Sequence, residues 1–218
     1  MKIGNGTLKD ADERGIDDKM LLLLQRTAVL LLLLAVSGSV VIGSGVFDPK
    51  PVGPLQMSAH PGTMTVLPGE IEMKWLEIAL PAADFSVRET AVFRTGEPDS
   101  LFGLILGSDD IDLLIAVSPL GYVTINNQQP TTIQPSVLSP QSSVLFPLQP
   151  WPHVRSRTAP NEIWVDVVDG EMTVRINREL LWTGPIEMMP DRMGLFGQSF
   201  GETAVFDFQS AAVFSESN

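Results

Sequence analysis

The sequence predicts an all-β protein, an antiparallel sandwich or barrel, preceded by one transmembrane helix. Three observations support this prediction. Residues 27–47 contain no charged residue, short apolar segments separated by Gly and Pro follow from residue 64, and two alternating segments flank Asp169-Gly170. Asp-Gly between alternating segments is the strongest short-range signal for a two-residue β-hairpin. The chain therefore divides into an apolar helix and a β domain.

The segment 27–47 is about long enough to cross a ~30 Å hydrocarbon core. Residues 1–26 hold five Lys or Arg, whereas the twenty residues after Phe47 hold only Lys50. This bias places the N-terminus in the cytoplasm. We therefore expect a cytoplasmic tail at 1–26, a signal-anchor helix at 27–47 and an extracytoplasmic domain, in a single-pass protein of the cell membrane.

A cleaved signal peptide is the alternative interpretation of this segment. Residues 30–36 would form its short apolar region, and Ala35-Val36-Ser37 or Gly43-Ser44-Gly45 would supply the small residues of a cleavage site. Against cleavage, five acidic residues lie in the first 26, and the apolar residues continue to Phe47. A retained anchor fits this pattern better.

Residues 48–63 are predicted to form a linker, because their four prolines and two glycines disfavour helix and strand. The exported β domain is expected at 64–218. Its alternation and turn signals predict strands at 64–67, 71–80, 85–94, 101–106, 112–117 and 121–125. Short strands with regular turn signals are typical of a sandwich or barrel.

Residues 126–160 differ from the rest of the domain. They hold seven prolines, which exclude a central strand. Apolar residues such as Phe146 and Trp151 favour an ordered loop that lies over a surface. Such a loop either packs on its own domain or docks a partner.

The order of segments near the C-terminus resembles a known family of β-sandwiches. An Asn-led strand from Asn161, the Asp169-Gly170 hairpin, a strand ending Ile176-Asn177, a Gly-Leu-Phe-Gly segment at 194–197 and a Val-Phe-Asp-Phe segment at 205–208 resemble laminin-G-like and concanavalin-A-like domains. The resemblance covers roughly residues 84–214 and implies an antiparallel two-sheet jelly-roll sandwich. It implies no particular activity, because one fold hosts many functions.

The turn after Ile176 departs from the family pattern. Laminin-G-like domains commonly have Asn-Gly at this place, whereas here Asn177 is followed by Arg178. Arginine tolerates a positive φ poorly, so we expect this turn to be longer or strained.

Charge and cysteine content narrow the function classes. The net charge is −12, and residues 1–26 carry equal numbers of bases and acids, so the negative charge lies in the exported part. This acidity argues against nucleic acid and against anionic lipid, which both need clusters of Lys and Arg. The chain has no cysteine, which excludes disulfides, thiolate metal sites and thiol catalysis. No cofactor is expected.

No catalytic or metal-ligating set of residues is apparent. Glu162 and Asp166 share one strand face about 13 Å apart, whereas glycoside hydrolases place their two carboxyl groups ~5 to 9.5 Å apart. His60 and His153 lack ligand spacing. Many laminin-G-like domains bind calcium at the sandwich rim, but the acidic run 109–112 lacks the features of an EF-hand loop and is better explained as a turn. We expect a non-enzymatic protein, with a sugar-acting hydrolase of this fold as a remote alternative.

The candidate functional residues lie on the outer face of the hairpin around Asp169-Gly170. A two-residue turn there places Trp164 opposite Arg175 and Asp166 opposite Thr173, and we expect Trp164 to be exposed. The candidates for a protein interface or a glycan site are Trp164, Arg175, Glu162, Asp166, Asn177 and Trp151. Three interpretations stay open: a sugar-stacking platform, a protein interface, and a Trp–Arg stack that packs within the chain.

The opposite face of the hairpin strands, together with the segments 194–197 and 205–208, is expected to form the core. Pairing the strands one residue out of register would expose these residues. The residues expected to be buried are Ile163, Val165, Val167, Met172, Val174, Ile176, Leu195, Phe206 and Phe208.

For function, we expect a non-catalytic accessory subunit of a larger membrane complex, such as a bioenergetic complex. It would contact integral membrane proteins through the sandwich surface and the helix, whose Gly/Ser-rich half allows close helix packing. The alternative is a membrane-tethered, lectin-like carbohydrate-binding module.

Overall fold

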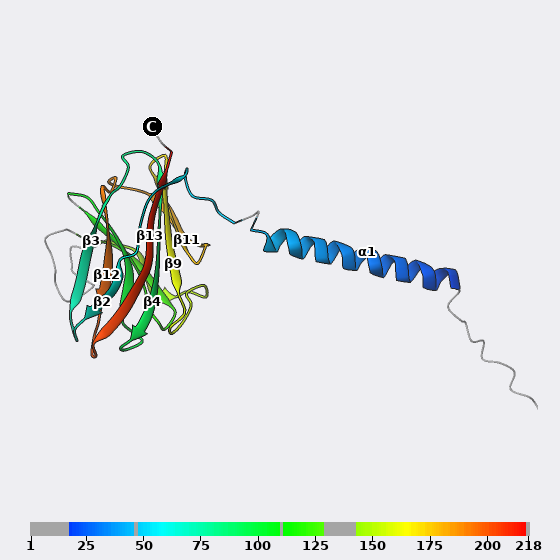
Figure 1. The fold of residues 1–218 in the computed structure, drawn as a ribbon, viewed down its shortest axis with the longest axis horizontal. Coiled ribbons are helices and arrows are strands. Elements are labelled where there is room, and N and C mark those ends of the chain that lie inside the picture. The colour runs from blue at the N-terminus through cyan, green and yellow to red at the C-terminus, as the bar shows by residue number, and fades with distance from the viewer. Residues whose placement is uncertain (1–17, 46–47, 110, 129–142, 217–218) are drawn as a thin grey trace, which may run out of the picture. The chain divides into compact units, whose positions relative to one another are not determined.

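The computed structural model describes residues 18–45, 48–109, 111–128 and 143–216 (Figure 1). The chain consists of two units, Met1–Asp48 and Pro49–Asn218, and each is described by itself. Most of the predicted cytoplasmic tail lies outside the described residues.

The first unit contains helix α1 (Asp18–Gly43). Its residues Met20–Val41 are long and apolar enough to cross a membrane, and a signal sequence would meet the same test. The hydroxyl groups of Thr27 and Ser39 donate to the carbonyl oxygens of Leu23 (3.0 Å) and Ala35 (2.9 Å), one turn earlier. Polar groups in a bilayer must be satisfied internally in this way. One apolar N-terminal helix is thus present, while its orientation and its retention stay predictions.

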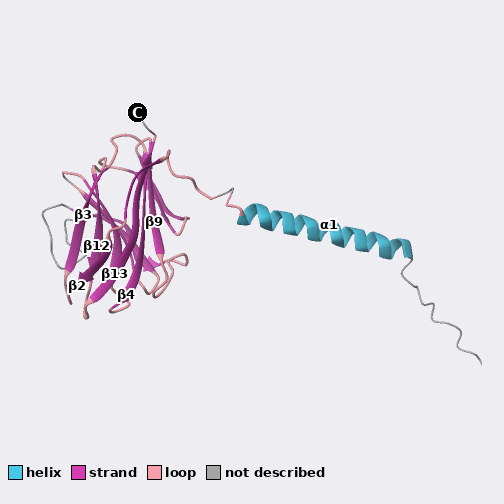
Figure 2. Ribbon diagram, viewed as in Figure 1, coloured by secondary structure: helices cyan, strands magenta, loops and turns pink. Residues whose placement is uncertain are grey.

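The second unit is a sandwich of two antiparallel sheets (Figure 2). One sheet has the order β1-β13-β4-β9-β10-β11, with β2 paired to β13, and the other has the order β3-β12-β5-β6-β7-β8. The strands of the described residues are β1 (Leu55–Ala59), β2 (Gly62–Val66), β3 (Ile71–Ala79), β4 (Phe85–Thr95), β5 (Leu101–Gly107), β6 (Asp112–Val117), β7 (Tyr122–Gln128), β8 (Ser143–Pro150), β9 (Asn161–Val168), β10 (Glu171–Ile176), β11 (Glu179–Pro185), β12 (Arg192–Gln198) and β13 (Ala204–Ser215). The predicted all-β, antiparallel two-sheet fold is confirmed.

Two strands lie in segments that the sequence assigns to a linker and a loop. Strand β1 lies within the linker 48–63, because its five residues fall between Pro54 and Pro61 and are free of proline. Strand β8 lies within the Pro-rich segment 126–160. Both strands are at a sheet edge, where proline in or beside a strand is tolerated because one side of the backbone needs no partner.

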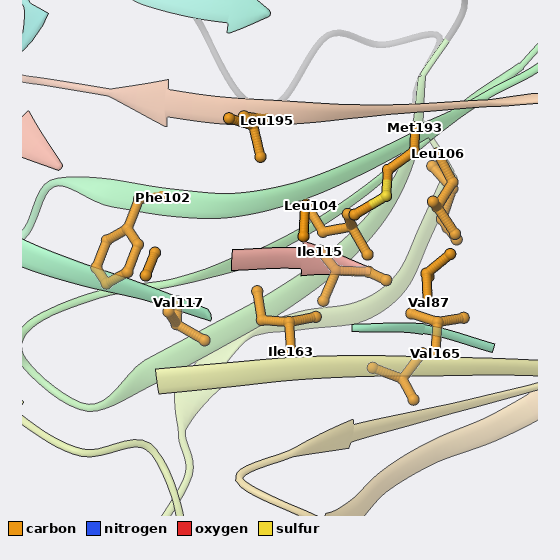
Figure 3. Packing of buried hydrophobic residues seen from close by; sticks show 14 of the residues in the cluster. Val87, Phe102, Leu104, Leu106, Ile115, Val117, Ile163, Val165, Met193 and Leu195 are labelled. Atoms are coloured by element: carbon orange, nitrogen blue, oxygen red, sulfur yellow. The ribbon is translucent and has the colours of Figure 1, made fainter. Parts of the chain in front are cut away.

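Side chains from the inner faces of both sheets form one core. Figure 3 shows Val87 of β4 and Ile163 and Val165 of β9 on one side, with Leu104 of β5 and Leu195 of β12 on the other. All nine residues that the sequence places in the core are buried. The predicted register of the hairpin is therefore confirmed.

The two turns of the β9–β10–β11 meander have the same backbone form. Asp169 and Gly170 have φ of 52° and 77°, and Asn177 and Arg178 have φ of 53° and 75°. Positive φ at both central residues is the type I′ geometry that suits two-residue hairpins. The second turn is therefore not longer than the first, and Arg178 occupies a conformation that is unfavourable for a residue with a Cβ atom.

Candidate functional site

Trp164 is buried, so its predicted exposure is wrong. The guanidinium carbon of Arg88 lies 3.5 Å from the centroid of the Trp164 ring and 5.1 Å from that of Phe214. Arg88 comes from β4, the neighbour of β9 on the side away from the hairpin. The pKa of Arg88 is lowered, chiefly by burial, and the nearby carboxylates of Glu162 and Asp166 oppose this shift.

Asp166 connects the polar groups around Trp164. Its Oδ1 atom accepts hydrogen bonds from Ser86 Oγ and from Trp164 Nε1, each at 2.5 Å. Its Oδ2 atom forms an ion pair with Arg175. The predicted pairing of Trp164 with Arg175 is confirmed, but these contacts form a closed network that leaves no Trp164 surface for stacking.

The other predicted residues also contact their own chain. Glu162 forms an ion pair with Arg178 at 3.6 Å. Asn177 accepts a hydrogen bond from the backbone N–H of Glu162 at 3.0 Å and donates to the carbonyl oxygen of His153 at 2.7 Å. Trp151 packs edge-on against Phe146, with ring centroids 6.4 Å apart. Among the three interpretations, packing within the chain accounts best for this face.

A half-exposed tryptophan lies on the outer face of the other sheet. Trp75, on the edge strand β3, is 37% exposed. A Cβ atom at Gly107 would lie 2.6 Å from Trp75 Cη2, and one at Gly194 would lie 2.9 Å from Trp75 Cε3. Glycine at these two positions therefore lets the indole lie directly against the sheet.

Two charged side chains adjoin this indole. The guanidinium carbon of Arg192 lies 4.5 Å from the centroid of the Trp75 ring. Arg192 Nη2 donates to the carbonyl oxygen of Ser108 at 2.8 Å and lies 3.4 Å from Asp112 Oδ1. Burial raises the pKa of Asp112, although the hydrogen bond and charge of Arg192 act in the opposite direction. We call Trp75, Arg192 and Asp112 the Trp75 corner.

The same sheet face carries amide groups with unused hydrogen-bonding capacity. Trp75, Gly194, Ile105, Leu114 and Asn126 form one row across five strands. Strand spacing places Asn126 about 19 Å from Trp75. Its Oδ1 atom is buried and has no hydrogen-bond partner among the described residues, and the same holds for the Oε1 atom of another residue on this face, Gln198. Ile105, Leu114, Asn126 and Gln198 are all buried, so Trp75 is the member of this row that a ligand can reach.

Sequence reasoning missed the Trp75 corner, although it predicted the strand 112–117 that begins at Asp112 and the strand 71–80 that contains Trp75. The structure places Asp112 at the start of β6, and no group of metal-ligating side chains occurs in the part of the chain that the structure describes. Gly107 and Gly194 were an available signal, because glycine in a strand often marks a close approach. The side chain that these glycines accommodate, Trp75, lies on another strand, however, and only the pairing of the strands places it beside them.

No known protein family matches the sequence, and no curated protein is similar to it. Among solved structures, Crh5 transglycosylase in complex with NAG is 11% identical over 78% of this chain and 89% of that chain, with a TM-score of 0.52. A structure from members of the human gut microbiota that express endo-acting O-glycanases to initiate mucin breakdown is 8% identical over 71% of this chain and 79% of that chain, with a TM-score of 0.51. Carbohydrate-binding module CBM66 from Bacillus subtilis is 10% identical over 74% of this chain and 99% of that chain, with a TM-score of 0.48.

At these identities the similarity concerns the fold. The chain has the jelly-roll, concanavalin-like sandwich of these structures. The narrower resemblance to laminin-G-like domains stays a prediction.

Proposed function

We propose that this protein is a lectin-like carbohydrate-binding module carried by an N-terminal membrane helix. The Trp75 corner is the observation that supports this function most. Its half-exposed indole offers an apolar surface to the C–H face of a sugar ring, and Arg192, which the buried Asp112 holds in place, offers hydrogen-bond donors to sugar hydroxyls. Binding sites for small molecules combine such an apolar surface with a few placed polar groups. Similarity in fold to a transglycosylase solved with NAG adds support.

Binding without hydrolysis is part of this proposal. Glycoside hydrolases of the common type use two carboxyl groups. Among the described residues, the contacts of the Trp75 corner include one carboxyl group, that of Asp112. Glu162 and Asp166, on the other sheet, are each paired with an arginine.

An accessory subunit of a membrane complex is the second candidate function. The apolar helix supports it, and so does the edge strand β11, which among the described residues pairs with β10 alone. The fold comparisons favour the carbohydrate-binding module over this role.

The test is glycan binding by the full chain in lipid nanodiscs, first on a polysaccharide array and then by calorimetry. We expect Trp75→Ala to weaken binding at least tenfold, which corresponds to about 1.4 kcal/mol. Phe200→Ala is the matched control, because Phe200 is also an exposed aromatic residue but lies after the end of β12. A wild-type chain that binds no glycan, or a Trp75→Ala chain that binds as well as wild type, would contradict the proposal.

A further inference from the structure

A pocket lies between the two sheets on the side of the edge strands β8 and β11. Its volume is about 140 Å³. Apolar side chains from both sheets line it, including Leu145 of β8, Met172 of β10 and Trp182 of β11, and its polar lining residues are Asn127 and Glu187. A Cβ atom at Gly184 would lie 2.5 Å from Trp182 Cζ2, so the indole that forms this wall extends along its own strand.

The size and chemistry of the pocket limit its occupant. A cavity of about 150 Å³ lined by Leu, Ile and Phe binds benzene in another protein, and pockets for larger ligands are about 300 to 1,000 Å³. One apolar group of the size of a phenyl ring therefore fits, and a sugar chain does not. Two polar lining residues are also too few for the several hydroxyl groups of a sugar ring.

Strand β11 beside this pocket has an open edge. Among the described residues it pairs with β10 alone. Its seven residues contain no lysine, and proline occurs only at the last position. Leu180 on this strand is 56% exposed. An unpaired strand with exposed apolar residues is a template for pairing with another chain.

The other three sheet edges carry features that discourage such pairing. Strand β3 has charges at Glu72, Lys74 and Glu77, and β8 contains Pro147 and Pro150. Strands β1 and β2, which both pair with β13 at the remaining edge, have only five residues each. Charges, prolines, short strands and bulges are the devices by which proteins protect sheet edges. Strand β11 shares one of these devices, an irregular register with β10 between Val174 and Arg175, but it is longer than β1 and β2 and has no lysine and no proline before its last position. It is therefore the least protected edge among the described strands.

We propose that β11 accepts an extended segment of a partner protein as an added strand, and that one large apolar side chain of this segment enters the pocket. Trp182 pairs with Val174, a core residue, so its side chain is on the inner face. Alternate side chains of a strand added beside β11 would face the same way, toward the pocket. Strand addition of this kind combines backbone hydrogen bonds for affinity with a side-chain pocket for specificity.

Charge identifies the partner as a basic segment from a different protein. Glu179 begins β11 and Glu187 lines the pocket. Lys or Arg residues on either side of the apolar side chain would complement these acids. Two copies of this chain, each with a net charge of −12, would repel each other. This contact is separate from the Trp75 corner, so it does not depend on glycan binding.

The probe is the capped peptide Lys-Thr-Thr-Phe-Thr-Thr-Lys, titrated against the full chain in lipid nanodiscs and followed by fluorescence anisotropy. We expect saturable binding that weakens at least tenfold when Phe in the peptide is replaced by Ala. This change leaves the protein untouched, so a folding defect cannot cause it. Hydrogen exchange should also slow at the backbone amides of 179–185 when the peptide binds.

Leu180→Lys should weaken peptide binding at least tenfold, because lysine on an edge discourages pairing. Leu148→Lys is the matched control, since Leu148 is 55% exposed on β8, an edge that prolines already protect; its affinity should equal that of wild type. Absence of saturable binding, or equal affinity of the Phe and Ala peptides, overturns the proposal. A wild-type dimer that Leu180→Lys dissociates would assign the edge to a second copy and would also overturn it.

Discussion

Glu89 is a carboxylic acid inside the apolar core, and its ionisation should control how stability depends on pH. It lies on the inner face of β4 between Val87 and Ala91, and it pairs with Ile163 and Ala211 on the two neighbouring strands. Both of its carboxyl oxygens are buried without a hydrogen-bond partner among the described residues. Burial disfavours the charged form and raises the pKa of Glu89 well above 4.5.

A raised pKa in the folded state means that the folded protein holds the proton more tightly than the unfolded chain does. The protonated carboxyl group favours the folded state most below the pKa of unfolded glutamate, and this stability is lost as the pH rises toward the pKa of the folded state. Between these two values, Glu89 lowers the free energy of unfolding by about 1.4 kcal/mol per pH unit. Glu89→Gln cannot ionise, so it should remove this slope.

The measurement is urea unfolding of the full chain in detergent micelles, followed by tryptophan fluorescence between pH 4.5 and 7.5. The free energy of unfolding of Glu89→Gln minus that of wild type should grow with pH, because the pH dependence of all other groups cancels in the difference. Glu171→Gln, at an exposed glutamate, should show no such growth. A pH-independent difference for Glu89→Gln would refute the assignment of a neutral, buried Glu89.

Three further outcomes are expected. Asp166→Ala should lower the free energy of unfolding by about 2 to 3 kcal/mol in urea titrations, because Trp164 Nε1, Ser86 and Arg175 lose a shared acceptor; a change below the error of the titration would show that the network adds nothing. Arg178→Gly should raise the free energy of unfolding by about 1 kcal/mol, because glycine relieves the positive φ and the ion pair lost with Glu162 involves a half-exposed arginine; a loss of stability instead would contradict the strain. Protease outside intact cells should remove the β domain and leave a membrane-bound fragment that contains residues 2–26; a mature N-terminus near Gly38 or Val46 would show cleavage instead.

Local patterns predicted the sheet architecture well, because they depend on neighbours in the sequence. Alternation gave the inner residues of β9 and β10, and Asp169-Gly170 gave their register. Prolines marked the ends of several strands, but they also led to the assignment of β1 to a linker and of β8 to a loop. Proline excludes a central strand and not an edge strand. Which strands are edges depends on pairing between distant segments.

The prediction of the candidate site was wrong because it lacked the same information on pairing between distant segments. The hairpin pattern placed Trp164 beside Arg175, but it did not show which strand lies on the other side of β9. The structure places β4 on that flank, and Arg88 of β4 covers the indole. In contrast, Trp75 sits on the last strand of its sheet, so no strand lies on its outer side to supply a cover. Exposure of an aromatic side chain on a sheet face thus depends on strand order, which the sequence pattern does not show.

The two outer faces therefore differ in which aromatic side chain a ligand can reach. On the seven-stranded sheet, Asp166 satisfies Trp164, Ser86 and Arg175, so a ligand would have to break existing hydrogen bonds to bind there. On the six-stranded sheet, Trp75 is 37% exposed, whereas Trp164 on the seven-stranded sheet is fully buried. A sugar ring that stacks on an exposed indole removes apolar surface from water without breaking hydrogen bonds within the protein. Exposure of Trp75 is therefore the reason why the glycan site is proposed on this face and not at the hairpin.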